Sequence, residues 1–235
     1  MEKLRQAFRK AGRWVKRNAR PLEAARWEYA FESGPRERVL DVLEAYQNED
    51  GGFGHGIEPD FWLPASSPMA AWAAARILLE VEADHDLPMV QALVDYLCCS
   101  QEPTGVWPAV LPDNNAFPHA PWWQWKPGVE KRWMFNPSVE LAAHLIYWAS
   151  PGSSAAEQGW KTVPLALKRL MDCTEMDMHE IANYLMFREL MEPKAAELAE
   201  RTGYLLVNVE RKLKELAAAA VEMDVSQWDC GYKAL

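Results

Sequence analysis

The chain has 235 residues, of which 49% are hydrophobic and 25% charged, and its formal net charge is −9. This composition is typical of a soluble globular protein, and the acidic balance argues against a nucleic-acid partner. No apolar run reaches the ~20 residues that span a bilayer. The four cysteines show neither a disulfide framework nor metal-ligand spacing, so we expect a cytoplasmic protein.

Residues 1–20 form the first expected element, a basic amphipathic helix. They hold eight basic side chains and one acidic side chain, Glu2, so this segment carries +7 and the rest of the chain −16. Leu4, Phe8, Ala11 and Val15 mark one apolar face. The sequence leaves two interpretations open: peripheral contact with an anionic membrane surface, or packing of the apolar face on the acidic body.

Helices separated by loops follow along the chain, with no alternating strand pattern. The expected helices cover residues 21–31, 36–47, 68–82, 88–100 and 137–149. The helices over 68–82 and 137–149 are apolar on nearly all sides and should be buried, whereas the helices before them have polar faces. This alternation predicts an inner and an outer ring of helices.

A spaced pattern of leucine, glutamine, glycine and an aromatic residue occurs twice. The first copy is Leu43, Gln47, Gly51 and Phe53, and the second is Leu97, Gln101, Gly105 and Trp107. Glycine readily takes the left-handed conformation that ends a helix, and a glutamine amide can satisfy unpaired backbone groups there. We therefore expect each copy, termed a clasp, to fasten the end of one helix to the start of another.

The C-terminal part repeats the pattern more loosely, over residues 160–235. Pro164 is expected to begin a helix that ends near Cys173, and a capping box at Asp177 and Glu180 starts another. A third clasp is expected at Gln227, Gly231 and Tyr232. Because the chain stops soon afterwards, at Leu235, we expect an open or incomplete ring.

The clasps carry a family resemblance. Residues 96–107 resemble the Gln-Trp repeat of squalene–hopene and oxidosqualene cyclases, whose α/α toroid also occurs in protein prenyltransferase β subunits. Residues 46–54 are similar to both groups, and their continuation through Trp62 resembles an uncharacterised bacterial branch. The resemblance, which is clear over residues 36–150, implies a single all-α toroid domain with a small apolar, isoprenoid-like ligand in its central cavity.

The catalytic motifs of that superfamily are missing. The chain contains neither the Asp-x-Asp-Asp motif of triterpene cyclases nor the Asp-Asp-x-x-Asp motif that holds magnesium, and no histidine matches the zinc set of prenyltransferases. We therefore expect no cofactor, although the sequence leaves zinc or magnesium open. It also leaves the oligomeric state and turnover itself open.

The best catalytic candidates follow the first clasp. His55, Glu58 and Asp60 place an imidazole and two carboxylates within six residues, which suits acid–base chemistry or cation binding. The alternative is a structural turn, in which His55 bonds to backbone and the carboxylates are solvated.

The candidate ligand-binding residues are aromatic, with one buried acid–histidine pair. The loop from Gly105 to Asn136 spans 31 residues against 16 between Gly51 and Ser67, so it is 15 residues longer. Its indoles could line a cavity or simply cover the core. The expected ligand-binding residues are Trp62, Trp122, Trp123, Trp125, Trp133, Glu140 and His144.

Three functions fit these residues. The first is binding or processing of the isoprenoid-like ligand, with Glu58 and Asp60 as polar partners. The second is a carbohydrate-active α/α-barrel protein that uses the same carboxylates with indole platforms. The third is a non-catalytic interaction scaffold.

Overall fold

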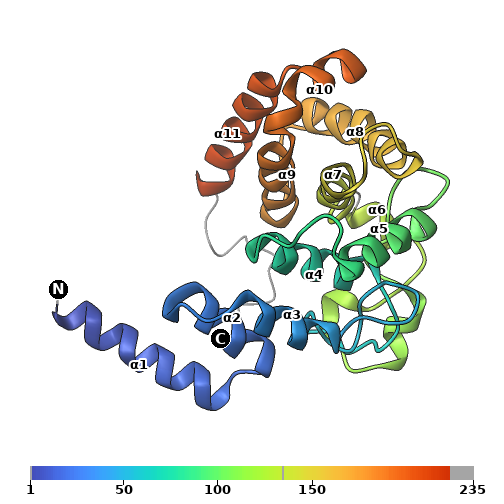
Figure 1. Ribbon diagram of the computed structural model, residues 1–235. Helices are drawn as coiled ribbons and strands as arrows, with labels where there is room; N and C mark the ends of the chain where they lie inside the picture. Colours follow the sequence, from blue (N-terminus) through green and yellow to red (C-terminus); the bar gives the residue numbers. More distant parts are fainter. Residues whose placement is uncertain (1, 134, 223–235) are drawn as a thin grey trace.

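The computed structural model is all-helical and describes residues 2–133 and 135–222 (Figure 1). The long helices are α1 (Glu2–Asn18), α2 (Pro21–Glu32), α3 (Arg36–Glu44), α4 (Pro68–Glu80), α5 (Pro88–Ser100), α7 (Ser138–Trp148), α8 (Ser154–Asp172), α9 (Met178–Met191), α10 (Ala195–Thr202) and α11 (Leu206–Glu222). Short turns of helix are η1 (Pro112–Ala116), η2 (Pro121–Trp123), α6 (Glu130–Trp133) and η3 (Glu192–Lys194). Over the described ranges there is no strand, and no helix is long and apolar enough to cross a membrane.

The helices pack as successive antiparallel hairpins, with α4 against α5, α7 against α8, and α9 against α11. The first helices of these hairpins, α4, α7 and α9, contact one another in order, and so do α5, α8 and α11. Helix α7 is the most enclosed element, since every residue except Tyr147 is buried. The continuous apolar surface of α4 and α7 that the sequence shows is therefore what places these helices between their neighbours.

Both clasps lie just after a helix end, but the prediction that their glycines end the helices is wrong. Helix α3 ends at Glu44, short of the expected residue 47, and α5 ends at Ser100. The Gly51 and Gly105 N–H groups instead close later turns by donating to the carbonyl oxygens of Asn48 and Glu102.

Gly51 and Gly105 have φ values of +82° and +87°, and the Phe53 and Trp107 side chains are fully buried. The Gln47 amide Nε2 donates 3.0 Å hydrogen bonds to the carbonyl oxygens of Gly51 and of Met89 at the start of α5. The first clasp thus closes its own turn and also reaches α5.

The second clasp makes the equivalent connection to α8. Gln101 Nε2 donates to the Gln158 carbonyl oxygen at 3.1 Å and to Thr162 Oγ1 at 3.0 Å. Its aromatic residue also connects the turn to α7, because the Trp107 backbone N–H donates to Ser138 Oγ at 2.9 Å. The two clasps therefore link α3 to α5 and α5 to α8 in the same way.

Two expectations for the C-terminal part need comment. The prediction that Pro164 begins a helix is wrong, because α8 already starts at Ser154 and Pro164 lies inside it. Ser153 caps this helix by accepting a hydrogen bond from the Ala156 N–H, and Pro164 lies on the exposed side. The third clasp, at Gln227, Gly231 and Tyr232, lies outside the described residues, as does Cys230.

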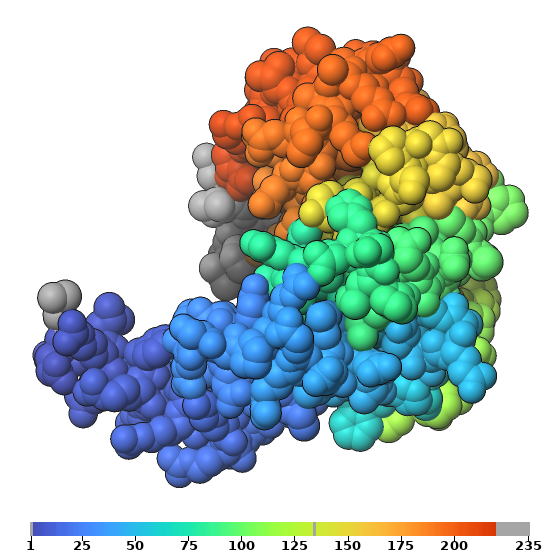
Figure 2. All heavy atoms as spheres, in the orientation of Figure 1, coloured from blue at the N-terminus to red at the C-terminus, as the bar shows by residue number. Residues whose placement is uncertain are grey.

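Helix α1 projects from the body and contacts it mainly through α2 (Figures 1 and 2). Gly12 is its one buried residue, and it packs against the Trp27 ring. The Phe8 ring stacks on Trp27 with a centroid distance of 5.2 Å. The apolar face of α1 is therefore only partly covered.

Candidate functional site

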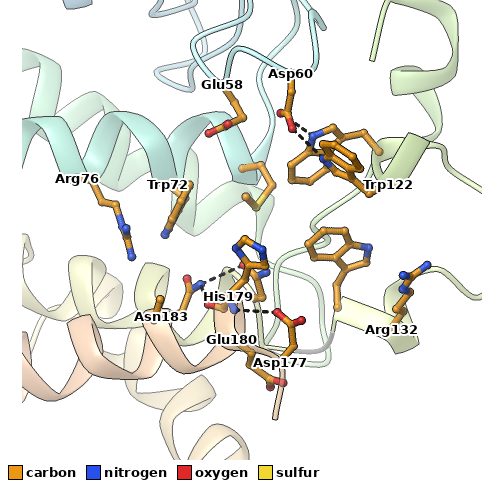
Figure 3. A pocket seen from close by; sticks show the side chains of 15 residues that line it. Glu58, Asp60, Trp72, Arg76, Trp122, Arg132, Asp177, His179, Glu180 and Asn183 are labelled. Carbon is orange, nitrogen blue, oxygen red and sulfur yellow. Dashed lines mark hydrogen bonds between the residues drawn. The ribbon is translucent and has the colours of Figure 1, made fainter. Parts of the chain in front are cut away.

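A pocket of about 440 Å³ opens where the N-terminal halves of α4 and α9 face the loops that follow the two clasps (Figure 3). One wall carries Glu58 and Asp60, and α9 forms the opposite wall. Four indole rings complete the lining, those of Trp72, Trp122, Trp123 and Trp133. The pocket is thus aromatic at its sides and bears carboxylates on two walls.

The Asp60 carboxylate holds two of these indoles in place. Its Oδ2 accepts a 2.8 Å hydrogen bond from Trp122 Nε1, and its Oδ1 accepts one of 2.7 Å from Trp123 Nε1. Trp123 also stacks on Trp133, with ring centroids 5.1 Å apart and planes within 11°. Because both carboxylate oxygens are engaged, Asp60 primarily positions the aromatic wall.

Backbone pairing explains why two loops so distant in the sequence meet here. The Ala120 N–H donates to the Asp60 carbonyl oxygen at 2.8 Å, and the Trp62 N–H donates to the Pro118 carbonyl oxygen at 2.9 Å. These bonds flank an isolated bridge between Phe61 and His119. The site is therefore built across the two clasp loops.

Among the titratable side chains that line the pocket, Glu58 has a strongly raised pKa. Burial and then the negative charge of Asp60 raise its pKa to about 7, against the opposing charges of Arg20 and Arg76. A hydrogen bond with the Asp60 carboxylate also favours the protonated form. A carboxyl group with this pKa can donate or accept a proton near neutral pH.

Arg20, at the junction of α1 and α2, fixes the backbone that carries Glu58. Its guanidinium donates to the carbonyl oxygens of Gly56 and Ile57, the latter at 3.0 Å from Nη2, and pairs with Glu23. Arg20 therefore positions the Glu58 loop and places a positive charge near it.

The α9 wall contains a capped helix start and a buried ion pair. Asp177 Oδ1 accepts a 2.8 Å hydrogen bond from the His179 N–H, which caps α9. Glu180 forms two 2.7 Å hydrogen bonds with Arg169 of α8. Both carboxylates are thus engaged by the fold itself.

Some polar atoms of the pocket have no protein partner. Asn183 is only 2% exposed and donates through Nδ2 to Asn136 Oδ1 and to the His179 carbonyl oxygen, at 3.1 and 2.7 Å. Within the described ranges its Oδ1 accepts no hydrogen bond, and Trp72 Nε1 and Trp133 Nε1 donate none. These three atoms are themselves buried within the walls, so a molecule in the pocket reaches them only after a local rearrangement.

The predicted pair of Glu140 and His144 lies behind the pocket and does not line it. Both side chains are fully buried on α7, with His144 Nε2 3.3 Å from Glu140 Oε1. Arg76, which does line the pocket, bonds to both Glu140 oxygens at 2.6 and 2.7 Å. Burial opposes ionisation of Glu140, but the hydrogen bonds from His144 and Arg76 lower its pKa overall. This pair therefore supports Arg76, whose guanidinium also stacks over Trp72 at 4.4 Å.

Three further candidates lie away from the pocket. His55 is exposed and its Nε2 bonds to Asn48 Oδ1 at 2.9 Å, which orders the turn after the first clasp. Trp62 is 60% exposed and donates to the Pro59 carbonyl oxygen at 3.0 Å. Trp125 is half-buried in the second loop, beside Asn115. The structure therefore unites Glu58, Asp60, Trp122, Trp123 and Trp133 and separates these three from them.

Sequence reasoning missed Arg20, Trp72, Arg76 and Asn183. A signal existed for two of them, because Trp72 and Arg76 stand four residues apart on an alanine-rich helix and so share one face. Arg20 and Asn183 carry no comparable sequence signal. Arg20 bonds to the distant backbone of Gly56 and Ile57, and Asn183 bonds to the distant Asn136 side chain.

No cluster of three or more His, Cys, Asp or Glu that could hold a metal ion occurs in the part of the chain that the structure describes. Cys98, Cys99 and Cys173 are unpaired thiols. Comparison of the chain with protein-family models, curated proteins and solved structures finds no match.

Proposed function

We propose that this chain is an α/α-toroid protein related to terpenoid cyclases and protein prenyltransferase β subunits. The support for this relationship is the repeated clasp, with its glutamine, left-handed glycine and buried aromatic residue, together with two rows of contacts, one among α4, α7 and α9 and one among α5, α8 and α11. The unpaired cysteines agree with the cytoplasmic location that we propose.

The pocket, in this proposal, binds a small isoprenoid-like ligand against its indole wall. Four indoles and Met69 offer apolar contact, and Asp60 holds two of the rings in fixed orientations. Indole faces also attract positive charge, which suits a ligand that becomes cationic during reaction. The polar partners of this ligand are Glu58 and Arg76.

Glu58 is the proposed proton donor. The observation that carries this role is its pKa of about 7 beside the pocket. In the transfer the O–H bond of the Glu58 carboxyl breaks, a new bond forms between that proton and a ligand atom, and the carboxylate that remains is stabilised by the charges of Arg20 and Arg76. Asp60 keeps its two indole hydrogen bonds throughout.

A carbohydrate ligand is the second candidate, because of one observation. The pocket is lined by polar side chains, among them Glu58, Arg76 and Asn183, which suit a molecule with several hydroxyl groups better than a hydrocarbon. Sugar rings also stack on indoles, and carboxylates on two facing walls are a common arrangement in glycan-processing enzymes.

Ligand titration of the purified protein distinguishes these candidates. We would follow indole fluorescence while adding farnesol or cellobiose to wild-type protein, Trp133→Ala and the matched control Trp62→Ala. Saturable binding of farnesol that Trp133→Ala weakens about tenfold, with Trp62→Ala unchanged, supports the isoprenoid proposal. The same pattern with cellobiose supports the second candidate.

Absence of saturable binding for both probes, or equal losses in the two variants, would overturn the assignment of the pocket as a ligand site. An interaction scaffold would then be the better description.

A further inference from the structure

We propose that α1 docks on the surface of an anionic lipid bilayer. Leu4, Ala7, Ala11 and Trp14, termed the α1 stripe, lie on successive turns of this helix, and all four are exposed. Leu4 is 74% and Trp14 64% exposed, which is high for large apolar side chains. The inference does not depend on the function proposed for the pocket.

The protein covers one edge of the helix and leaves the stripe open. Gly12 and Phe8 pack against Trp27 of α2, which fixes the orientation of α1. Phe31 of α2 lies beside Phe8, with ring centroids 5.5 Å apart, and is itself 57% exposed. Phe8 and Phe31 therefore extend the stripe sideways into one apolar surface.

Basic residues border this surface on both sides. At about 100° per residue, Lys3, Lys10 and Arg17 follow one edge of the stripe, and Arg5 and Lys16 follow the other edge of the apolar face. Lys3, Arg5, Lys10 and Arg17 form no ion pair within the described residues. These four cations remain available to an anionic surface.

The charge distribution favours an anionic surface as the partner and an orientation in which α1 faces that surface. Residues 1–20 carry +7 and the remainder −16, so an anionic surface attracts α1 and repels the body. A second copy of this chain is disfavoured as the occupant, because two α1 helices would bring like charges together. A bilayer interface accepts a convex helix that is apolar along one side and basic along its borders, with no need for a complementary groove.

Vesicle sedimentation of the full chain tests this proposal. We expect the protein to sediment with vesicles of phosphatidylcholine mixed with phosphatidylglycerol, and to stay in the supernatant with phosphatidylcholine alone. Raising NaCl to about 0.5 M should reduce the bound fraction several-fold, because exposed charges are then screened within a few ångströms.

Variants separate the stripe from general charge effects. Leu4→Glu with Trp14→Glu should lower the bound fraction at least about fivefold, since both the apolar contact and the net basic charge decrease. The matched control is Leu185→Glu with Val207→Glu, which makes the same charge change at apolar residues that are 51% and 64% exposed elsewhere on the surface. This control should bind like the wild type.

The proposal fails if wild-type protein does not sediment with the anionic vesicles, or if both double variants lose binding equally. It also fails if light scattering shows a dimer that the Leu4 and Trp14 changes dissociate, because a second copy then covers the stripe. Binding to polyglutamate with equal strength, and equal loss in the α1 variant, would assign the surface to an acidic protein instead.

Discussion

The two clasp units have the same frame and different loops. Gln47 and Gln101 make equivalent bonds to α5 and α8, respectively, and their glycines have φ values within a few degrees of each other. The loop after the first clasp supplies the carboxylates, whereas the longer loop after the second supplies indoles. The loops meet where Asp60 accepts hydrogen bonds from Trp122 and Trp123. The two clasps thus share their geometry, whereas the loops that follow them differ in length and residue type. The candidate site forms where these two different loops meet.

The largest expected effect is a difference in stability loss between alanine substitutions of two tryptophans, one from each loop. Trp123 is 5% exposed, stacked on Trp133 and bonded to Asp60, so Trp123→Ala should cost about 4 kcal/mol of unfolding free energy. Trp62 is 60% exposed, and Trp62→Ala should cost less than about 1 kcal/mol. Urea denaturation followed by circular dichroism measures both values. Similar costs would mean that the two loops contribute equally to the core.

The next effect tests the bond between the loops. Asp60→Ala leaves two indole N–H groups without their charged acceptor and should destabilise the protein by about 3 kcal/mol. Asp86→Ala, at an exposed aspartate, is the control and should change the unfolding free energy by less than about 0.5 kcal/mol. If Asp60→Ala were equally neutral, the two loops would not depend on this carboxylate.

Glu58 gives the stability of the protein a dependence on pH. Because its folded pKa of about 7 exceeds its ordinary value of 4.5, its favourable contribution is complete below pH 4.5 and is lost as pH rises through 7. The full shift corresponds to about 3 kcal/mol, which we reduce to about 2 kcal/mol because the side chain is only partly buried. We therefore expect the unfolding free energy of the wild type, relative to that of Glu58→Gln, to be about 2 kcal/mol lower near pH 8 than near pH 4.

The informative quantity is the difference in unfolding free energy between wild type and Glu58→Gln at each pH, because contributions common to both proteins cancel. Parallel pH profiles for the two proteins would show that Glu58 has an ordinary pKa. The proposed proton donor would then lose its main support.

The smallest expected effects compare the two clasp glutamines directly. Gln47→Ala removes an amide that bonds to its own turn and to α5, and Gln101→Ala removes one that bonds to its own turn and to α8. Each substitution should lower the unfolding free energy by about 1–2 kcal/mol. Gln6→Ala, on the exposed side of α1, serves as the control. Costs that differ by more than about 2 kcal/mol would show that the two clasps are energetically unequal despite their matching geometry.

Local patterns predicted the helices and the clasps. The glutamine-to-glycine spacing predicts an amide near a helix end and a left-handed glycine, and both are found, although the glycines close turns after α3 and α5 and do not end these helices. The apolar surfaces of α4 and α7 likewise predicted their burial. Pro164 misled the prediction, because the Ser153 cap that starts α8 outweighs the local effect of proline in a helix.

The candidate site was only partly predictable, because its residues acquire their roles from distant partners. Asp60 was identified as a catalytic candidate, yet both of its oxygens are used by indoles 62 and 63 residues further on. Glu140 and His144 were correctly paired at four residues apart, but Arg76 stands between them and the pocket. Short-range spacing shows which side chains share a helix face, whereas the direction of that face depends on the packing of the whole chain.

The acceptor that each clasp glutamine uses has a consequence for sequence change. Gln47 and Gln101 both reach a main-chain carbonyl on the adjoining helix, at Met89 and Gln158 respectively. Every amino acid supplies that carbonyl, so mutations can replace the residues at these two positions without removing the attachment. The residues at these two positions of α5 and α8 can therefore change while each glutamine keeps its bond to the neighbouring helix.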